Sequence, residues 1–348
     1  MTQPVGAPKQ RVGTAELRAE LQNALGRRSG TRQPIAELER RPTPYSTSFA
    51  IEELDVRLAD GTTLELVFKD LSRQALLGTA RRIRPAFVYS PLREIETYRT
   101  ILAPEDVGTA TCYGTVVDHR MGRYWLFLER VPGIELYQVG ELATWKRVAR
   151  WLALVHSRFA GKTEPLARAV PLLSYDGGLY RLWMRRAQEF SDEAESSQPK
   201  AVRRGIKWLA KRYNRVVERL LALPVTFIHG EFYASNVLVH NTSGKLRVCP
   251  VDWEMAAVGP GLIDLAALIS GGWTAEEKEA LAKAYHAGLA PCDERWTDLD
   301  EFLIGLDHCR LHLAVQWLGW ASEWSPPLEH TQDWLGEAVG LAEKLGLA

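Results

Sequence analysis

Alternating apolar and polar positions dominate the chain between residues 45 and 132. "IEELDVRLADGTTLELVFKD" holds two such runs on either side of Asp60 and Gly61, which is the pattern of a β-hairpin. "LREIETYRTIL" predicts a helix, and "TCYGTVVD" and "RYWLFLERV" predict two further strands. The order strand, strand, helix, strand, strand predicts a small, mainly antiparallel lobe over residues 45–132.

From residue 141 onward the apolar positions recur with helical spacing. "PVTFIHG" and "KLRVCPVDWE" are short β-rich runs within this part, and "LIDLAALIS" predicts one more helix. Residues 133–348 are expected to form a larger helical lobe, which begins near Pro132 and Gly133. The positions with helical spacing are Leu142, Trp145, Val148, Leu152, Val155 and Phe159, and then Ile206, Leu209, Tyr213, Val216 and Leu220.

Residues 1–44 precede both lobes and are rich in Arg, Pro and Gly. "GTAELRAELQNALGRR" predicts one short amphipathic helix, because Leu17, Leu21 and Leu25 share one stripe. The segment as a whole is therefore expected to be a flexible or helical N-terminal arm.

Composition argues against several classes of protein. The 348 residues carry 43 basic and 43 acidic side chains, a balance that argues against a dedicated nucleic-acid-binding protein. No stretch approaches the roughly 18 continuous apolar residues of a membrane span. "MTQPVGAPKQRVG" has no apolar signal core, so a cytoplasmic protein is expected. The four cysteines are widely spaced and include no CxxC pair, which is typical of reduced thiols.

"FIHGEFYASNVLV" carries the candidate chemistry. It places the carboxylate of Glu231 five residues before the amide of Asn236, in a loop between two predicted strands, and Asp252 follows at the end of an apolar run. Phosphoryl transfer needs a carboxylate that orients the acceptor hydroxyl and oxygen ligands for the metal on the phosphates. Mg²⁺ prefers hard oxygen ligands, which Asn and Asp supply.

These segments together resemble the aminoglycoside phosphotransferase and choline kinase family, small-molecule relatives of the protein kinases. The family pattern is H-G-D-x-x-x-x-N, then D-x-E or a similar triplet, then G-P-x-x-D-L-A. It falls here on His229, Gly230, Glu231, Asn236, Asp252, Glu254, Gly259, Pro260 and Asp264. The resemblance implies an α+β, two-lobed protein-kinase-like fold with a small β N-lobe and a larger helical C-lobe. It also implies that ATP binds between the lobes.

The resemblance extends to the first lobe. "LVFKD" resembles the strand that bears the phosphate-binding lysine, which would be Lys69. "LREIETYRTIL" resembles the helix whose glutamate pairs with that lysine. The best alignment gives this role to Glu94, with Glu96 as the alternative.

Other segments of the first lobe would hold the nucleotide. "FLERVPG" resembles the connection between the lobes, where the carbonyl of Glu129 and the amide of Val131 would hold the adenine edge. "YSTSFAIEEL" lies where the phosphate-covering loop belongs. It has no glycine, so Ser46, Thr47 and Ser48 would offer hydroxyls and backbone N–H groups instead.

Residues of the second lobe divide into chemical and supporting roles. By resemblance, Glu231 orients a substrate hydroxyl, while Asn236 and Asp252 hold one or two Mg²⁺ ions. His229 is expected to brace the loop, because a buried polar ring needs partners. Asp264 begins a helix, where a carboxylate is favoured, and would steady the same loop.

Two further side chains have open or structural interpretations. Glu254 is either a neighbour that supports the metal ligands or a solvated side chain. His156, in "LALVHS", is expected to be a packed core histidine.

Glu231 stands where the family pattern has aspartate. Glutamate keeps the charge but adds one methylene, and small misplacements are costly when catalysis depends on positioning. The rest of the set is present, which favours an active ATP-dependent small-molecule kinase. The alternative is a catalytically impaired, nucleotide-binding pseudokinase of the same fold.

The acceptor is expected to be a small molecule with a hydroxyl group, because only residues 253–263 separate Asp252 from Asp264, too few for the long activation segment of protein kinases. A protein kinase remains a third possibility.

Charge leaves the chemistry of the acceptor open. Residues 274–348 hold 5 basic and 14 acidic side chains, which with nearby tryptophans would suit an amino sugar or amino alcohol. Residues 176–220 hold 11 basic and 6 acidic side chains, which would suit an anionic acceptor. Both stretches also fit solvated helix faces with the tryptophans in the core. The tryptophans are Trp296, Trp317, Trp320, Trp324 and Trp334.

Overall fold

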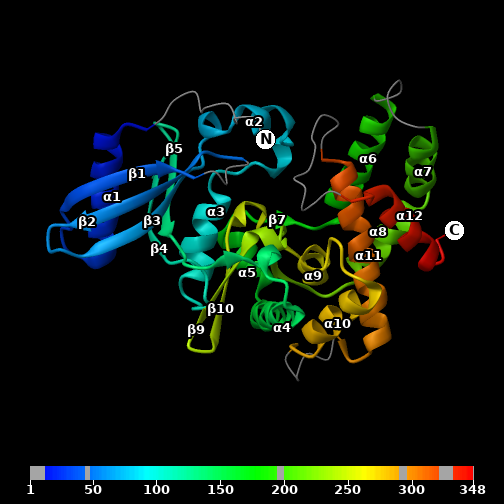
Figure 1. Ribbon diagram of the computed structural model, residues 1–348. Helices are drawn as coiled ribbons and strands as arrows, with labels where there is room; N and C mark the ends of the chain where they lie inside the picture. The colour runs from blue at the N-terminus through cyan, green and yellow to red at the C-terminus, as the bar shows by residue number, and fades with distance from the viewer. Residues whose placement is uncertain (1–11, 44–47, 194–199, 290–295, 321–331, 348) are drawn as a thin grey trace. The chain divides into compact units, whose positions relative to one another are not determined.

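A computed structural model describes residues 12–43, 48–193, 200–289, 296–320 and 332–347. The contacts divide the chain into two compact units, residues 1–133 (unit 1) and residues 134–348 (unit 2). Figure 1 shows the course of the chain through both. Within the described residues, no helix is long and apolar enough to cross a lipid bilayer. The architecture is mixed α and β, with an antiparallel sheet in unit 1 and mostly helices in unit 2.

Unit 1 is built on a five-stranded antiparallel sheet with the order β1-β2-β3-β5-β4. The predicted hairpin around Asp60 and Gly61 is confirmed as β2 and β3, and Gly61 has the positive φ of 90° that such a turn requires. The strands are β1 (Ile35–Pro42), β2 (Ile51–Leu58), β3 (Thr63–Asp70), β4 (Cys112–Asp118) and β5 (Arg123–Glu129).

The helices of unit 1 are mostly short. The predicted helix in "LREIETYRTIL" is confirmed, and its second half, Thr97–Leu102, is π-helical. The α-helices are α1 (Thr14–Ser29), α2 (Gly78–Ile83) and α3 (Arg93–Glu96), and single 3₁₀ turns cover Arg73–Ala75 and Ala86–Val88.

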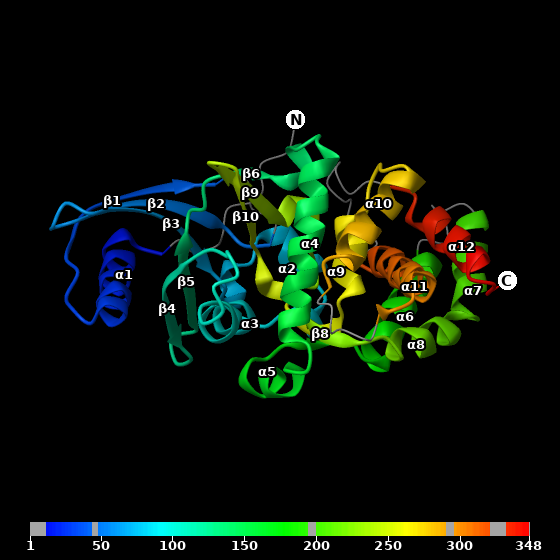
Figure 2. The same cartoon turned by 90° about the horizontal axis from the view of Figure 1, so that it is seen from below.

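The helix predicted in the N-terminal segment is confirmed as α1, and residues 12–43 belong to the folded unit, which corrects the expectation of a flexible arm. Helix α1 buries Leu17, Leu21 and Leu25 against one face of the sheet, where they meet Leu54, Phe68, Trp125 and Phe127. Figure 2 shows α1 lying against the strands. Residues 35–42 were expected to be flexible but form the edge strand β1. Apolar alternation does not reveal this strand, because most of its side chains are charged and form ion pairs with β2. One of these pairs is Arg40 with Glu52.

Unit 2 is mostly helical and contains two small three-stranded sheets, β10-β9-β6 and β7-β11-β8. Its strands are β6 (Ile134–Glu135), β7 (Leu173–Ser174), β8 (Val225–Ile228), β9 (Val237–Thr242), β10 (Lys245–Pro250) and β11 (Ala257–Pro260). Its α-helices are α4 (Leu142–Phe159), α5 (Thr163–Ala169), α6 (Gly177–Glu193), α7 (Lys200–Ala210), α8 (Tyr213–Leu221), α9 (Leu262–Leu268), α10 (Ala275–His286), α11 (Leu299–Leu318) and α12 (Trp334–Lys344). Single 3₁₀ turns cover Leu136–Gln138, Ala234–Asn236 and Trp253–Met255.

The core of unit 2 surrounds α11, which contacts α6, α8, α9 and α12 (Figure 1). The expected apolar stripe of α4 is buried from Trp145 to Phe159. The single helical run expected around residues 205–221 is wrong in one respect, because the chain turns between α7 and α8. Arg212 lies at this turn, and its guanidinium donates to the carbonyl of Leu347 at 2.7 Å.

Candidate active site

Lys69 and Glu94 form a buried ion pair within unit 1. Lys69 lies near the end of β3, opposite Leu126 of β5, and Glu94 lies in α3. The ammonium donates to the two carboxylate oxygens at 2.8 and 2.7 Å, and the side chains are 5% and 1% exposed. The alternative partner, Glu96, instead accepts hydrogen bonds from Arg99. A cation held at a fixed point by a charged partner is suited to binding phosphate oxygens.

The segment expected to hold the nucleotide base begins where β5 ends. The backbone N–H of Glu129 donates to the carbonyl of Thr111 at 2.8 Å, and its carboxylate accepts from the Thr111 N–H at 3.0 Å. The backbone N–H of Arg130 donates to the carbonyl of Glu65 at 2.9 Å, and Val131 follows. Residues 129 and 130 are therefore tied by their main chain to neighbouring strands.

The expected phosphate-covering loop is described only from Ser48 onward. The carbonyl of Ser48 accepts a hydrogen bond from the N–H of Leu77 at 3.0 Å. Ser46 and Thr47 lie outside the described residues.

A buried carboxylate organises the loop of unit 2 that carries Glu231. Asp264, in the first turn of α9 and 0% exposed, accepts from the backbone N–H groups of His229 at 2.7 Å and Gly230 at 2.8 Å. His156 Nε2 lies 3.2 Å from Asp264 Oδ2, and His156 Nδ1 lies 2.8 Å from the hydroxyl of Tyr285. Helices α4, α9 and α10 thus fix the loop through one chain of polar groups.

His156 is buried as expected, but its bond to Asp264 went unpredicted. Its helical position indicates only that the side chain faces the core. No signal along the chain connects it with the loop at residue 229.

Gly230 is required where the loop passes another segment closely. It has a φ of 84°, and a Cβ atom there would lie 2.3 Å from the carbonyl oxygen of Met255. Only glycine adopts this conformation and leaves room for that oxygen. The main chain just before Glu231 is therefore held against the turn that follows Asp252.

The ring of His229 joins the loop to the residue before Asp252. Its Nε2 lies 2.9 Å from the carbonyl of Val251, and its Nδ1 accepts from the backbone N–H of Glu231 at 3.3 Å. This pattern fits a neutral imidazole whose Nε2–H donates and whose Nδ1 accepts. The ring is 1% exposed and packs against Trp253 with a centroid distance of 4.5 Å. His229 therefore braces the loop.

Asn236 and Asp252 are linked through the same network. The side-chain Nδ2 of Asn236 donates to the backbone carbonyl of Glu231 at 3.0 Å. The backbone carbonyl of Asn236 accepts from the N–H of Val251 at 2.9 Å. Because the amide nitrogen is used in this way, the side-chain oxygen is the atom of Asn236 that can bind a cation. Asp252 follows β10 with the left-handed backbone φ 66°, ψ 60°, a strained conformation for a residue with a side chain.

Amide and carboxylate oxygens are the donor types that Mg²⁺ prefers, alongside phosphates and water. Among the residues that the structure describes, no group of three His, Cys, Asp or Glu side chains forms a separate metal site. Glu254 is only 8% exposed, which excludes the interpretation that it is a solvated side chain.

The comparisons with known proteins identify the family. The model of the phosphotransferase enzyme family (APH) matches residues 55–302, well over half of the chain. The chain belongs to this family. No sequence among the curated proteins matches it.

Several solved structures share the fold of this phosphotransferase. An ethanolamine kinase from Plasmodium vivax is 11% identical with a TM-score of 0.59, and the match covers 98% of this chain and 90% of that one. A microcompartment-associated aminopropanol kinase is 16% identical with a TM-score of 0.56, covering 88% and 90%. A spectinomycin phosphotransferase is 14% identical with a TM-score of 0.53, covering 97% and 100%. At these identities the likeness shows the fold.

Aromatic side chains of this phosphotransferase line up beside the loop. Tyr233 packs against Trp317 at a centroid distance of 5.4 Å, and Trp317 stacks on Trp334 at 5.1 Å. Trp317 is half-buried, and its contact with Tyr233 joins helix α11 to the loop. Trp320 stacks on Trp183 at 5.6 Å. Trp324 lies outside the described residues.

The negative charge of Glu231 contributes to the raised pKa of two buried tyrosines. Burial, followed by the nearby carboxylates, raises the pKa of Tyr175 and of Tyr233 well above the usual value of 10, and Glu231 is among these carboxylates. Tyr175 continues from β7, where its N–H donates to the carbonyl of Val258 at 2.9 Å. Both phenols therefore stay neutral beside Glu231. Sequence patterns did not single out either tyrosine, because each reads as an ordinary core aromatic.

Proposed function

We propose that this phosphotransferase transfers the γ-phosphoryl group of ATP to a hydroxyl group of a small molecule. The observation that carries the proposal is the loop of unit 2, in which hydrogen bonds join Glu231, Asn236 and the residue before Asp252 into one network. Positioning and electrostatic stabilisation supply most of the catalysis in phosphoryl transfer, and such a network provides positioning.

Each residue has a definite task in the proposed reaction. Lys69, held by Glu94, binds phosphate oxygens of the nucleotide, and the main chain at Glu129 and Val131 binds its base. Glu231 accepts the hydrogen bond of the acceptor hydroxyl and takes its proton as the oxygen attacks phosphorus. Asn236 and Asp252 hold Mg²⁺, which neutralises phosphate charge when it is bound.

Two features with a cost in free energy bear on the choice between an active enzyme and an impaired relative. Asp252 keeps a strained backbone, and a lysine carboxylate pair is kept buried in unit 1. Both features cost free energy and fit a site that binds nucleotide and metal, while the carboxylate of Glu231, which binding alone does not require, favours transfer.

The proposed acceptor is an amino alcohol or an amino sugar. Structures of the same fold include kinases named for ethanolamine and aminopropanol, and a spectinomycin phosphotransferase in complex with ADP. In this chain, Trp317 brings an aromatic ring against Tyr233 of the loop, and residues 274–348 have an excess of acidic side chains. Aromatic faces and carboxylates both favour cationic amines.

The test uses γ-labelled ATP with a panel of amino alcohols, amino sugars and nucleosides. Wild-type protein is expected to label at least one small molecule. Glu231→Gln is expected to lower kcat by about 100-fold or more, the usual contribution of a general base. Nucleotide binding without transfer to any acceptor would favour the impaired relative, and label in polypeptide would favour a protein kinase.

A further inference from the structure

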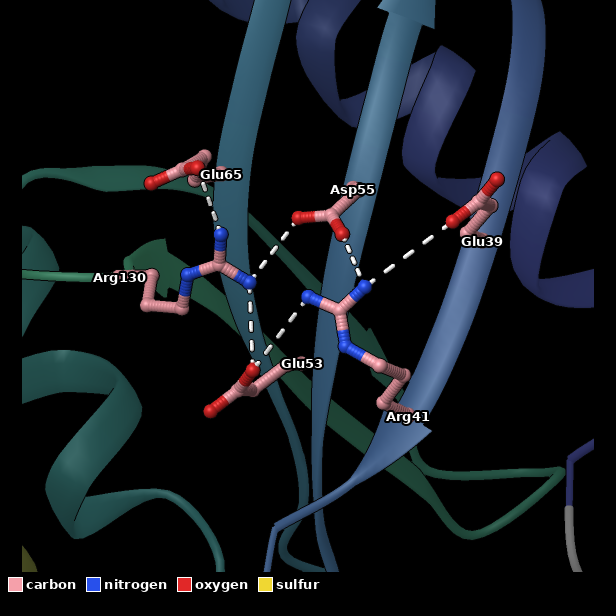
Figure 3. Close-up of polar contacts among 6 residues, drawn as sticks. All are labelled: Glu39, Arg41, Glu53, Asp55, Glu65 and Arg130. Atoms are coloured by element: carbon pink, nitrogen blue, oxygen red, sulfur yellow. Dashed lines mark hydrogen bonds and ion pairs between the residues drawn. The ribbon is translucent and has the colours of Figure 1, made fainter.

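One face of the unit 1 sheet carries a connected group of charged residues. Strands β1, β2 and β3 and the residue after β5 contribute to it, as Figure 3 shows. This face is opposite the one that α1 covers, because its positions alternate with the buried Leu54, Val56 and Leu66. The six residues of this network are Glu39, Arg41, Glu53, Asp55, Glu65 and Arg130.

Arg130 contacts three carboxylates of this network. Its guanidinium lies 3.2 Å from Glu53, 2.9 Å from Asp55 and 2.7 Å from Glu65, and its side chain is only 21% exposed. Its backbone N–H also donates to the carbonyl of Glu65 at 2.9 Å. Arg130 is therefore attached to β2 and β3 by both its main chain and its side chain.

Arg41 shares two of these carboxylates. It pairs with Asp55 and lies 3.6 Å from Glu53, so each of the two acids stands between two guanidinium groups (Figure 3). Partial burial acts to raise the pKa of Asp55, but the hydrogen bond from Arg41 and the charge of Arg130 together hold it below its usual value of 3.8. The shared acids couple the position of Arg130 to that of β1.

The place of Arg130 in the chain gives this network a consequence for ligand binding. The pairing of β3 with β5 ends at Leu66 and Glu129, so the chain leaves the sheet at residue 130. The last main-chain bond to β3 is the one made by Arg130. Beyond it, the side chain of Arg130 holds the backbone in place immediately before Val131.

We propose that Arg130 is a positioning residue for the nucleotide base. Its network fixes the main chain of residues 129–131, so that the carbonyl of Glu129 and the amide of Val131 meet the base at a set distance. This inference rests on the proposed function, because it assigns a support to the same nucleotide site. Lysine cannot replace Arg130, because an ammonium group does not offer the planar fork that reaches three carboxylates.

The alternative is that the network serves only the stability of the sheet. Ion pairs that water can still reach contribute little to stability, so the alternative predicts small effects that do not depend on the ligand. A positioning role predicts a loss that depends on the presence of a base. Two ligands that both carry a chain of phosphates, one with a base and one without, separate the two interpretations.

The experiment compares Arg130→Ala and Arg130→Lys with the wild-type protein by calorimetric titration. The ligands are ADP and inorganic tripolyphosphate, each with Mg²⁺. Arg57→Ala is the matched control, because Arg57 lies on the same sheet and pairs with Glu37 outside the network. Thermal unfolding of each variant verifies that it is folded.

Both Arg130 variants are expected to bind ADP about tenfold more weakly and tripolyphosphate within twofold of wild type, because only the base contacts are displaced. ATP KM is expected to rise with kcat nearly unchanged, and Arg57→Ala is expected to match wild type. Equal losses for both ligands, or no loss for ADP, would overturn the role of Arg130. A wild-type protein that binds no ADP would overturn the proposed function as well, which separates the two failures.

Discussion

Replacing Lys69 by methionine tests the buried ion pair of unit 1. Methionine has nearly the length of lysine but no charge, so the change leaves the carboxylate of Glu94 without its two bonds at 2.7 and 2.8 Å. Glu94 is 1% exposed and cannot turn to water without opening the packing around α3. Removing one partner of a buried pair costs about 3–5 kcal/mol. The strands around Lys69 are expected to lose roughly that much protection.

Hydrogen exchange of the β3 and β5 amides measures this loss locally, which suits a protein with two units. The second variant, Lys69→Met with Glu94→Leu, replaces the whole pair by apolar groups. It is expected to recover most of the protection, because an apolar pair of similar volume avoids the buried charge. Neither variant is expected to transfer phosphate. A loss below about 1 kcal/mol in Lys69→Met, or no recovery in the double variant, would refute the reasoning.

Three further predictions concern unit 2. Gly230→Ala should displace the loop and so lower kcat/KM by about 100-fold. The control is Gly244→Ala, because Gly244 has a similar φ of 83° but open space around it, so this change should cost stability alone. Equal kinetics of the two variants would contradict this. Asp264→Asn should lower both kcat and Tm, because an amide nitrogen would face a backbone donor, and an unchanged kcat would argue against a support role. The pKa of the fully buried His312 is lowered to about 3, so stability should fall as pH drops below 6.5 because only the unfolded chain takes up the proton. Urea unfolding at pH 6.5 and 5 should show about 2 kcal/mol more loss for wild type than for His312→Gln, and equal losses would reject the assignment.

Much of the sheet in unit 1 could be predicted because its strands bury one face. Leu54 and Val56 on β2, and Leu66 and Phe68 on β3, produce the alternation that identifies a strand. Strand β1 lacks such a signal. Its residues face β2 through ion pairs, and a charged segment of this kind cannot be told from a loop by apolar periodicity.

The residues of the candidate site also differ in how far the sequence alone could suggest them. Glu231, Asn236 and Asp252 could be proposed from the sequence because a local motif fixes their spacing. Support for their loop comes from a distant helix, because His156 of α4 lies 3.2 Å from Asp264. Such contacts depend on packing between helices, and a single sequence contains no spacing that reports them.

The most direct test of the account is ³¹P NMR of the reaction with ATP, Mg²⁺ and an acceptor that the wild-type protein uses. The account predicts that the γ-phosphorus signal of ATP is replaced by that of a phosphate monoester of the acceptor, at a rate at least about 100-fold lower in Glu231→Gln. Formation of only ADP and inorganic phosphate, or an equal rate of ester formation in Glu231→Gln, would contradict it.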